Sequence, residues 1–226
     1  MKKEKRQKLS SRRRRTLRRV LIAAATLFLV NRIFLIGLLF PIQAVRHTEE
    51  RMGTGRTSVV CRDWFPEIYK SQLIYLTENE NVLMLSGAYL SFYGWMSGFG
   101  VPLDCGPEAP IHGGWWSLNR GEEGKSLFYV FGRVDDPDID FLQITVRHNG
   151  EPPKKDGVWQ SIGFEWGLTR EDFIEKDGQP YFLLERYPVD WSDYPYGVTI
   201  TARGIDLEGN ILAEMELDQG ASSFFS

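Results

Sequence analysis

Residues 127–146 read LFYVFGRVDDPDIDFLQITV, and this segment predicts β-structure. One alternating run extends from Phe128 to Arg133, and a second extends from Leu142 to Arg147. Side chains that alternate with a period of two point to opposite faces of a strand. The segment therefore predicts two half-buried strands joined by an Asp-rich connection.

The same pattern continues on both sides of this segment. Residues 198–203 alternate, and Ile211, Ala213, Met215 and Leu217 share one face of a following strand. Earlier candidate strands are residues 72–77 and 82–93, and turn signals occur at 149–150, 177–178 and 208–210. Closely spaced hairpins with few helical signals favour an antiparallel β-sandwich, because parallel crossovers need longer connections. We expect one domain over residues 59–218, followed by a short C-terminal tail, 219–226.

Three segments carry a family resemblance over roughly residues 127–217. They are LFYVFGRVDDPDIDFLQITV, DGQPYFLLE and VTITARGIDLEGNIL. Together they resemble the Ig-like or fibronectin-like β-sandwich ectodomains of uncharacterised single-pass bacterial membrane proteins. The resemblance implies an Ig-like sandwich in which the turn from Asp206 to Asn210 is a structural hairpin element. It implies no activity.

The N-terminus combines a basic tail with an apolar run. Of the 27 Lys and Arg in the chain, 11 lie in residues 1–19, where Glu4 is the single acid. Residues 20–42 are about 23 residues, which would span roughly 34 Å as a helix. Under the positive-inside rule, the expected topology is a cytoplasmic tail (1–19), one transmembrane helix (20–42) acting as a signal-anchor in the lipid bilayer, and an extracytoplasmic domain at the cell membrane.

Asn31 and Arg32 interrupt the apolar run. One interpretation is an intramembrane site that pairs with a helix of a membrane partner, and the other is an arginine that reaches toward the headgroups. A second view of the whole segment is a signal peptide cleaved after Ala44, which would release a secreted β-sandwich. Both questions stay open at the level of the sequence.

Charge divides the chain beyond residue 42. There, 15 basic and 29 acidic residues remain, a net charge of −14 (15 − 29). An acidic domain argues against nucleic acid as a partner, because phosphate backbones attract basic surfaces. Residues 43–58 are polar, include two glycines and lack apolar periodicity, so we expect a short stalk.

Cys61 and Cys105 both belong to the part expected outside the cell, where disulfides form. A bond between them would close a loop of about 44 residues and stabilise the fold by roughly 4 kcal/mol. Free buried thiols are the alternative. Metal or redox chemistry has less support, since Cys105 and His112 lack a third ligand at a recognised spacing.

Asp136, Asp138 and Asp140 open like a calcium-binding loop, with carboxylates at alternate positions. The pattern then departs from that loop, because Phe141 replaces the required Gly and Arg147 replaces the bidentate Glu. An acidic turn before a strand is therefore the preferred interpretation. We expect no metal and no other cofactor.

The aromatic and histidine residues of the Gly-rich segment 93–116 are the remaining candidates for a site. Trp95, Trp115 and Trp116 could stack sugar rings beside His112, and the alternative is that they fill the core. No nucleophile stands at a recognisable elbow, so we do not expect an enzyme.

These patterns predict a membrane-anchored extracytoplasmic protein that acts by binding or assembly. The alternatives are a module that binds or processes cell-surface glycans, and the secreted β-sandwich.

Overall fold

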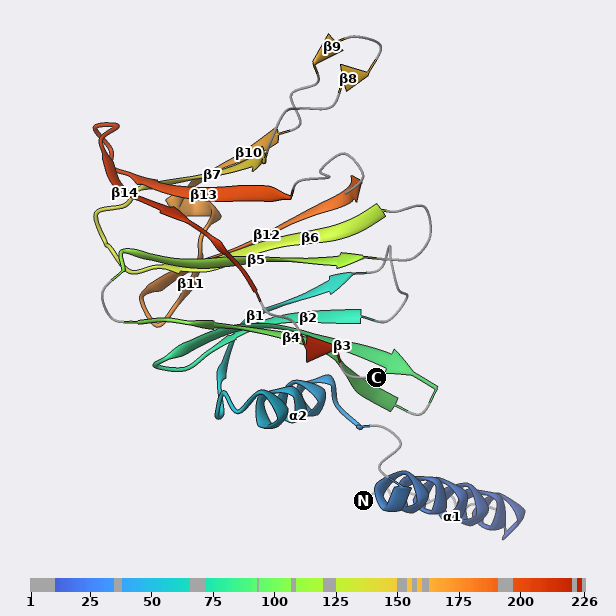
Figure 1. Cartoon of the computed structure of the whole chain (residues 1–226). Coiled ribbons are helices and arrows are strands. Elements are labelled where there is room, and N and C mark those ends of the chain that lie inside the picture. Colours follow the sequence, from blue (N-terminus) through green and yellow to red (C-terminus); the bar gives the residue numbers. More distant parts are fainter. Residues whose placement is uncertain are drawn as a thin grey trace, which may run out of the picture.

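The computed structural model describes residues 11–34, 38–65, 72–92, 94–106, 109–119, 125–149, 154–155, 158–159, 163–190, 197–220 and 223–224 (Figure 1). Two helices come first: α1 (Ser11–Phe34) and α2 (Pro41–Met52). The first sheet, sheet A, follows in the order β1-β2-β3-β4-β16. Its strands are β1 (Ser58–Phe65), β2 (Gln72–Glu78), β3 (Val82–Ser91), β4 (Gly94–Asp104) and β16 (Ser223–Phe224).

Two further sheets complete the body. Sheet B has the order β11-β12-β6-β5-β15, with β11 (Ile174–Lys176), β12 (Gln179–Asp190), β6 (Lys125–Val134), β5 (Ile111–Asn119) and β15 (Asp218–Gln219). Sheet C has the order β10-β7-β13-β14, with β10 (Gly163–Thr169), β7 (Phe141–His148), β13 (Val198–Ile205) and β14 (Ile211–Glu216). A short 3-10 helix, η1 (Arg170–Asp172), precedes β11, and a separate small hairpin pairs β8 (Lys154–Lys155) with β9 (Val158–Trp159).

The layers stack in the order α2, sheet A, sheet B, sheet C (Figure 1). One hydrophobic cluster lies between α2 and sheet A, a second between sheets A and B, and a third between sheets B and C. Most strand pairs are antiparallel, and the pairing of β15 with β5 is parallel. The predicted mainly β, antiparallel character is therefore present, with three stacked sheets where a sandwich has two.

Strand β6 lies in the middle layer and is buried on both faces. Tyr129 and Phe131 pack toward sheet A, whereas Phe128 and Val130 pack toward sheet C. All four are at most 1% exposed. The prediction of a half-buried strand is wrong here, because both sets of alternating side chains are apolar and each set meets a neighbouring sheet.

The C-terminal segment crosses all three sheets. The chain leaves β14 of sheet C, adds β15 to sheet B and then adds β16 to sheet A. The Gly220 amide donates to the Trp115 carbonyl at 2.9 Å, and a Cβ at Gly220 would lie 2.0 Å from Val101 Cγ1. Residues expected to form a tail thus tie the layers together, and the absence of a side chain at Gly220 permits the close passage.

The predicted transmembrane helix over residues 20–42 is wrong. In the part of the chain that the structure describes, no helix is both long and apolar enough to cross a bilayer. Helix α1 ends at Phe34, and a separate helix begins at Pro41. The apolar run of α1 from Val20 to Val30 covers roughly 16 Å between Arg19 and Asn31, about half the thickness of a hydrocarbon core.

Helix α2 occupies most of the segment expected to be a polar stalk. Ala44, Val45 and Thr48 are fully buried against sheet A. Gly100 on β4 lets the helix approach, since a Cβ there would lie 2.5 Å from Thr48 Cγ2. The peptide bond after Ala44 lies inside this helix, so cleavage there would remove the first turn of α2.

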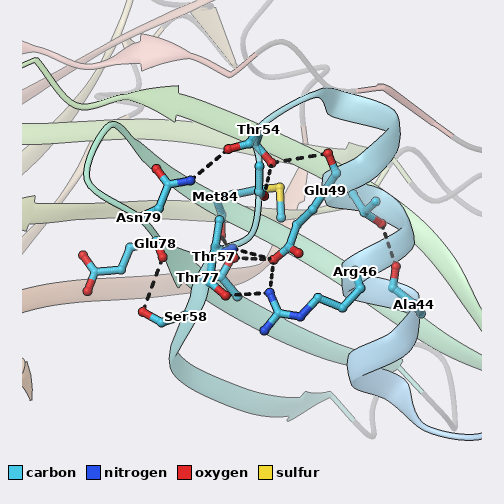
Figure 2. A network of polar contacts seen from close by, with 12 residues as sticks. Ala44, Arg46, Glu49, Thr54, Thr57, Ser58, Thr77, Glu78, Asn79 and Met84 are labelled. Carbon is cyan, nitrogen blue, oxygen red and sulfur yellow. Dashed lines mark hydrogen bonds and ion pairs between the residues drawn. The ribbon is translucent and has the colours of Figure 1, made fainter.

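A buried carboxylate fastens α2 to the start of β1 (Figure 2). Glu49 is 3% exposed and accepts hydrogen bonds from the Thr57 amide at 3.3 Å and from the Thr57 hydroxyl. Arg46 donates both to Glu49 and to the Thr57 carbonyl. Buried carboxylates are tolerated when they are paired in this way, so the network defines where α2 sits on the sheet.

Candidate functional site

Several exposed apolar side chains lie at one end of sheet A, next to Trp95, which is itself half-buried against the cluster between α2 and sheet A. Trp95 pairs with Leu90 across the β3–β4 hairpin, and its ring lies 6.4 Å from the Trp64 ring in an edge-to-face arrangement. The backbones of Trp95 and Leu38 exchange two hydrogen bonds of 2.8 Å. We call this group the aromatic end of sheet A, and its members are Leu39, Phe40, Trp64, Leu90, Phe92 and Trp95.

Local geometry presents these residues at the surface. Phe92 lies in the turn between β3 and β4 and is 97% exposed. The turn closes through a hydrogen bond of 2.9 Å from the Ser91 hydroxyl to the Gly94 carbonyl. Gly94 has a φ of 126°, a conformation that favours glycine. The turn therefore holds an aromatic side chain in solvent, where a polar residue is the usual occupant.

Helix α1 leads into the aromatic end and is itself exposed. Every side chain from Arg13 to Val30 is exposed, and Leu27 is 76% exposed. Its residues are divided along the axis: arginines occupy the first half, and apolar residues occupy the stretch after Arg19. Such a helix leaves a large apolar surface uncovered, which indicates a contact site.

Arg62 adds a basic group beside the aromatic end. It lies two residues before Trp64 on β1, so both side chains lie on the same face of the strand. Arg62 hydrogen-bonds Tyr75, the residue opposite it on β2. Burial raises the pKa of Tyr75, and the neighbouring Arg62 charge opposes that rise. The exposed Arg62 guanidinium next to the exposed Trp64 indole can bind an anionic group.

The other predicted aromatic residues do not form a surface platform. Trp115 is 8% exposed and packs between sheets B and C, whereas Trp116 is 2% exposed and packs between sheets A and B. Their rings contact Phe128 at 5.6 Å and Phe99 at 3.8 Å, respectively. Of the three predicted tryptophans, Trp95 alone is not fully buried: it is half-buried against the cluster between α2 and sheet A, and the exposed Trp64, which the sequence did not single out, lies beside it.

His112 is 6% exposed on β5 and belongs to a separate polar cluster. Its Nε2 lies 3.3 Å from Asp135 Oδ2. Arg133 binds the same carboxylate through two hydrogen bonds of 2.6 and 2.7 Å, and Gln179 donates to it at 3.1 Å. Burial lowers the pKa of His112, and the Asp135 charge partly offsets this effect. Within the described residues His112 Nε2 is buried and makes no hydrogen bond, so its contact with Asp135 is electrostatic, and the cluster lies on sheet B, away from Trp95.

The acidic turn is held by hydrogen bonds and an ion pair. Asp136 accepts a hydrogen bond from the Asp138 amide at 2.9 Å, and Asp140 pairs with Arg170 Nε at 2.9 Å. Within the described ranges, no group of three or more His, Cys, Asp or Glu could hold a metal ion. The three aspartates thus lie in a turn that leads into β7.

Cys61 and Cys105 are free thiols, so the predicted disulfide is not formed. Cys61 lies on β1 and Cys105 directly follows β4, with β2 and β3 between them. Three strand spacings amount to about 14 Å, beyond the 4.4 to 6.8 Å that a disulfide allows between Cα atoms. Burial raises the pKa of the Cys61 thiol to about 11 and also raises that of Cys105. Both sulfurs belong to the cluster between sheets A and B.

A serine and a histidine meet where α2 contacts β4. His47 Nδ1 lies 3.2 Å from Ser97 Oγ. The Ser97 hydroxyl donates to the Ala44 carbonyl at 2.8 Å, so its proton is directed away from the imidazole. This pair positions α2 on the sheet and does not form a nucleophile with its base.

Asn31 and Arg32, the predicted intramembrane polar pair, belong to the last turns of α1. Their side chains lie outside the described residues. Comparison with known proteins found no family model that matches the chain, and no curated protein or solved structure that matches it significantly.

Proposed function

We propose that this protein is a membrane-associated binding protein. In this proposal α1 contacts an anionic lipid bilayer, and the three-sheet body binds or assembles with neighbours at that surface. The observation that carries it is the composition of α1, in which arginines are followed by exposed apolar residues.

The two halves of α1 suit different depths of a bilayer surface. Exposed Leu, Ile, Val and Phe gain roughly 25 cal/mol for each Å² of apolar surface that leaves water. Arginines near an anionic leaflet each contribute on the order of 1 kcal/mol of attraction. Because the two features follow one another along α1, the arginines would lie at the headgroups while the apolar stretch after Arg19 contacts the acyl chains.

The negative charge of the body also favours a contact in which α1 faces the bilayer. Beyond residue 42 the net charge is −14, so an anionic surface repels the body while it attracts the arginines. The electrostatic part of the attraction therefore comes from the arginines of α1. Because these charges are exposed, added salt screens them, and binding should weaken as ionic strength rises.

Vesicle flotation of the full chain tests the proposal. Vesicles of phosphatidylcholine and phosphatidylglycerol in equal amounts should carry the protein upward, and vesicles of phosphatidylcholine alone should carry much less. Combined Arg13→Gln, Arg14→Gln and Arg15→Gln changes should reduce flotation with anionic vesicles, as should Leu21→Asp with Leu27→Asp.

Leu207→Asp provides the matched control. Leu207 is 74% exposed in the turn between β13 and β14, so this change introduces an aspartate on an exposed leucine far from α1 (Figure 1). Flotation should be unchanged. Failure of the wild-type chain to float, or equal losses for Leu207→Asp and the α1 variants, would contradict the proposal.

A further inference from the structure

We infer that the aromatic end of sheet A is a second lipid-binding surface that contacts the same bilayer as α1. This inference rests on the proposed function, because it takes the bilayer near α1 as given. It adds a binding surface on the folded body and an orientation: the sheets would stand with the β3–β4 hairpin toward the lipid.

Covalent geometry places the two surfaces close together. Three residues separate Phe34, the end of α1, from Leu38, which pairs with Trp95. A chain of that length reaches at most about 14 Å. Figure 1 places the β3–β4 hairpin beside the chain that enters α2. A bilayer that receives the end of α1 therefore lies within reach of the aromatic end.

The chemistry of the aromatic end matches the bilayer interface. Trp64 is 45% exposed and Phe92 is 97% exposed. The apolar side chains of Leu39, Phe40 and Leu90 are exposed as well. Tryptophan is enriched where acyl chains meet headgroups, because the indole is apolar on its faces and donates a hydrogen bond at its edge.

Arg62 supplies the polar complement. It lies on the Trp64 face of β1, one step nearer the centre of the strand, so it would sit at headgroup depth when the indole enters the interface. A guanidinium binds phosphate through paired donors. The aromatic end thus presents an apolar tip with a cation behind it, the order in which a lipid offers its acyl chains and its phosphate.

Tryptophan quenching on vesicles tests the inference with the full chain. The probe is a vesicle of equal phosphatidylcholine and phosphatidylglycerol in which the phosphatidylcholine carries bromine on its acyl chains. Bromine quenches indoles at the interface, and Trp115 and Trp116 are buried in the body. We expect quenching in the wild-type chain and its loss in a Trp64→Phe, Trp95→Phe variant that still floats.

A second measurement does not depend on removing tryptophans. Phe92→Asp should weaken vesicle affinity about tenfold, the size of effect expected when one exposed aromatic side chain leaves an apolar contact. Phe92 is almost fully exposed, so this variant should keep the wild-type melting temperature. Leu207→Asp should leave both affinity and quenching unchanged.

The outcomes separate the two proposals. If the α1 variants lose binding while Phe92→Asp keeps full affinity and quenching is absent, the inference is overturned and the proposed function stands. If the wild-type chain does not bind vesicles, both fail. If sedimentation shows a dimer that Phe92→Asp dissociates without lipid, the surface joins two copies of the chain, and the inference is overturned.

Discussion

Trp115 and Trp116 are consecutive residues on β5, yet their rings lie in two different hydrophobic cores. Adjacent side chains on a strand point to opposite faces, and sheet B has a sheet packed on each face. One dipeptide thus contributes to the contact of the middle sheet with both of its neighbours. The glycan-binding interpretation of these two residues is incompatible with this burial.

Truncation of either tryptophan should destabilise the fold strongly. We expect Trp115→Ala and Trp116→Ala each to lower the free energy of unfolding by about 3 to 5 kcal/mol, because each leaves a large cavity. Trp64→Ala should cost less than about 1 kcal/mol, since Trp64 is half exposed. Urea unfolding followed by circular dichroism measures all three. Equal losses in the three variants would contradict the layered packing.

Two glycines provide a matched test of the close contact inside sheet B. A Cβ at Gly132 would lie 2.2 Å from Phe182 Cζ and 2.3 Å from the His112 carbonyl oxygen, whereas a Cβ at Gly167 meets nothing within 4 Å. Gly132→Ala should therefore destabilise by about 2 to 4 kcal/mol. Gly167→Ala should stabilise by about 0.5 to 1 kcal/mol, because alanine loses less backbone entropy on folding. Chemical denaturation of both variants tests this difference, which a similar response at the two positions would refute.

The network in Figure 2 predicts that two adjacent glutamates differ in importance. Glu49→Ala removes the buried acceptor of Arg46 and Thr57 and should cost about 2 to 3 kcal/mol. Glu50→Ala changes an exposed side chain and should cost less than about 0.5 kcal/mol. Thermal unfolding monitored by fluorescence compares them. The assigned role of Glu49 would be wrong if the two variants melted together.

The raised pKa of Cys61 predicts that the reactivity of this thiol and the stability of the fold depend on pH. Its pKa of about 11, raised by burial, makes the thiolate about a hundredfold scarcer at pH 8 than in a thiol with a pKa of 9. Alkylation of native Cys61 should therefore be about a hundredfold slower than that of the unfolded chain. The unfolded state releases this proton near pH 9 and the folded state near pH 11, so the contribution to stability falls between these values.

A Cys61→Ala variant isolates that contribution. The difference in the free energy of unfolding between the wild-type chain and the variant should shrink as pH rises from 9 to 11. Mass spectrometry supplies the independent check: the unfolded chain should take up two alkyl groups without reductant, since both thiols are free. Labelling only after reduction would show a disulfide and refute this description.

The local sequence pattern predicted most strands, because a strand with one buried face alternates apolar and polar residues along the sequence. The alternation at residues 142–147 and 198–203 corresponds to β7 and β13, and the turn from Asp206 to Asn210 joins β13 to β14. The sequence of α2 shows a weaker apolar periodicity. Its buried face consists of Ala44, Val45, Thr48 and Glu49, and two of these are polar, so their burial depends on partners from β1 and β4.

Sequence information therefore accounts for the strand segments, the hairpin turns and the separation of a basic start from an acidic body. It does not account for the third sheet, the distance between Cys61 and Cys105, or the meeting of Trp64 with Trp95. Each of these depends on which strands pair and which faces meet, and both are set by contacts between residues far apart in the chain. A strand with apolar residues on both faces, such as β6, indicates that another layer packs on each face. Its sequence does not indicate which elements form those two layers.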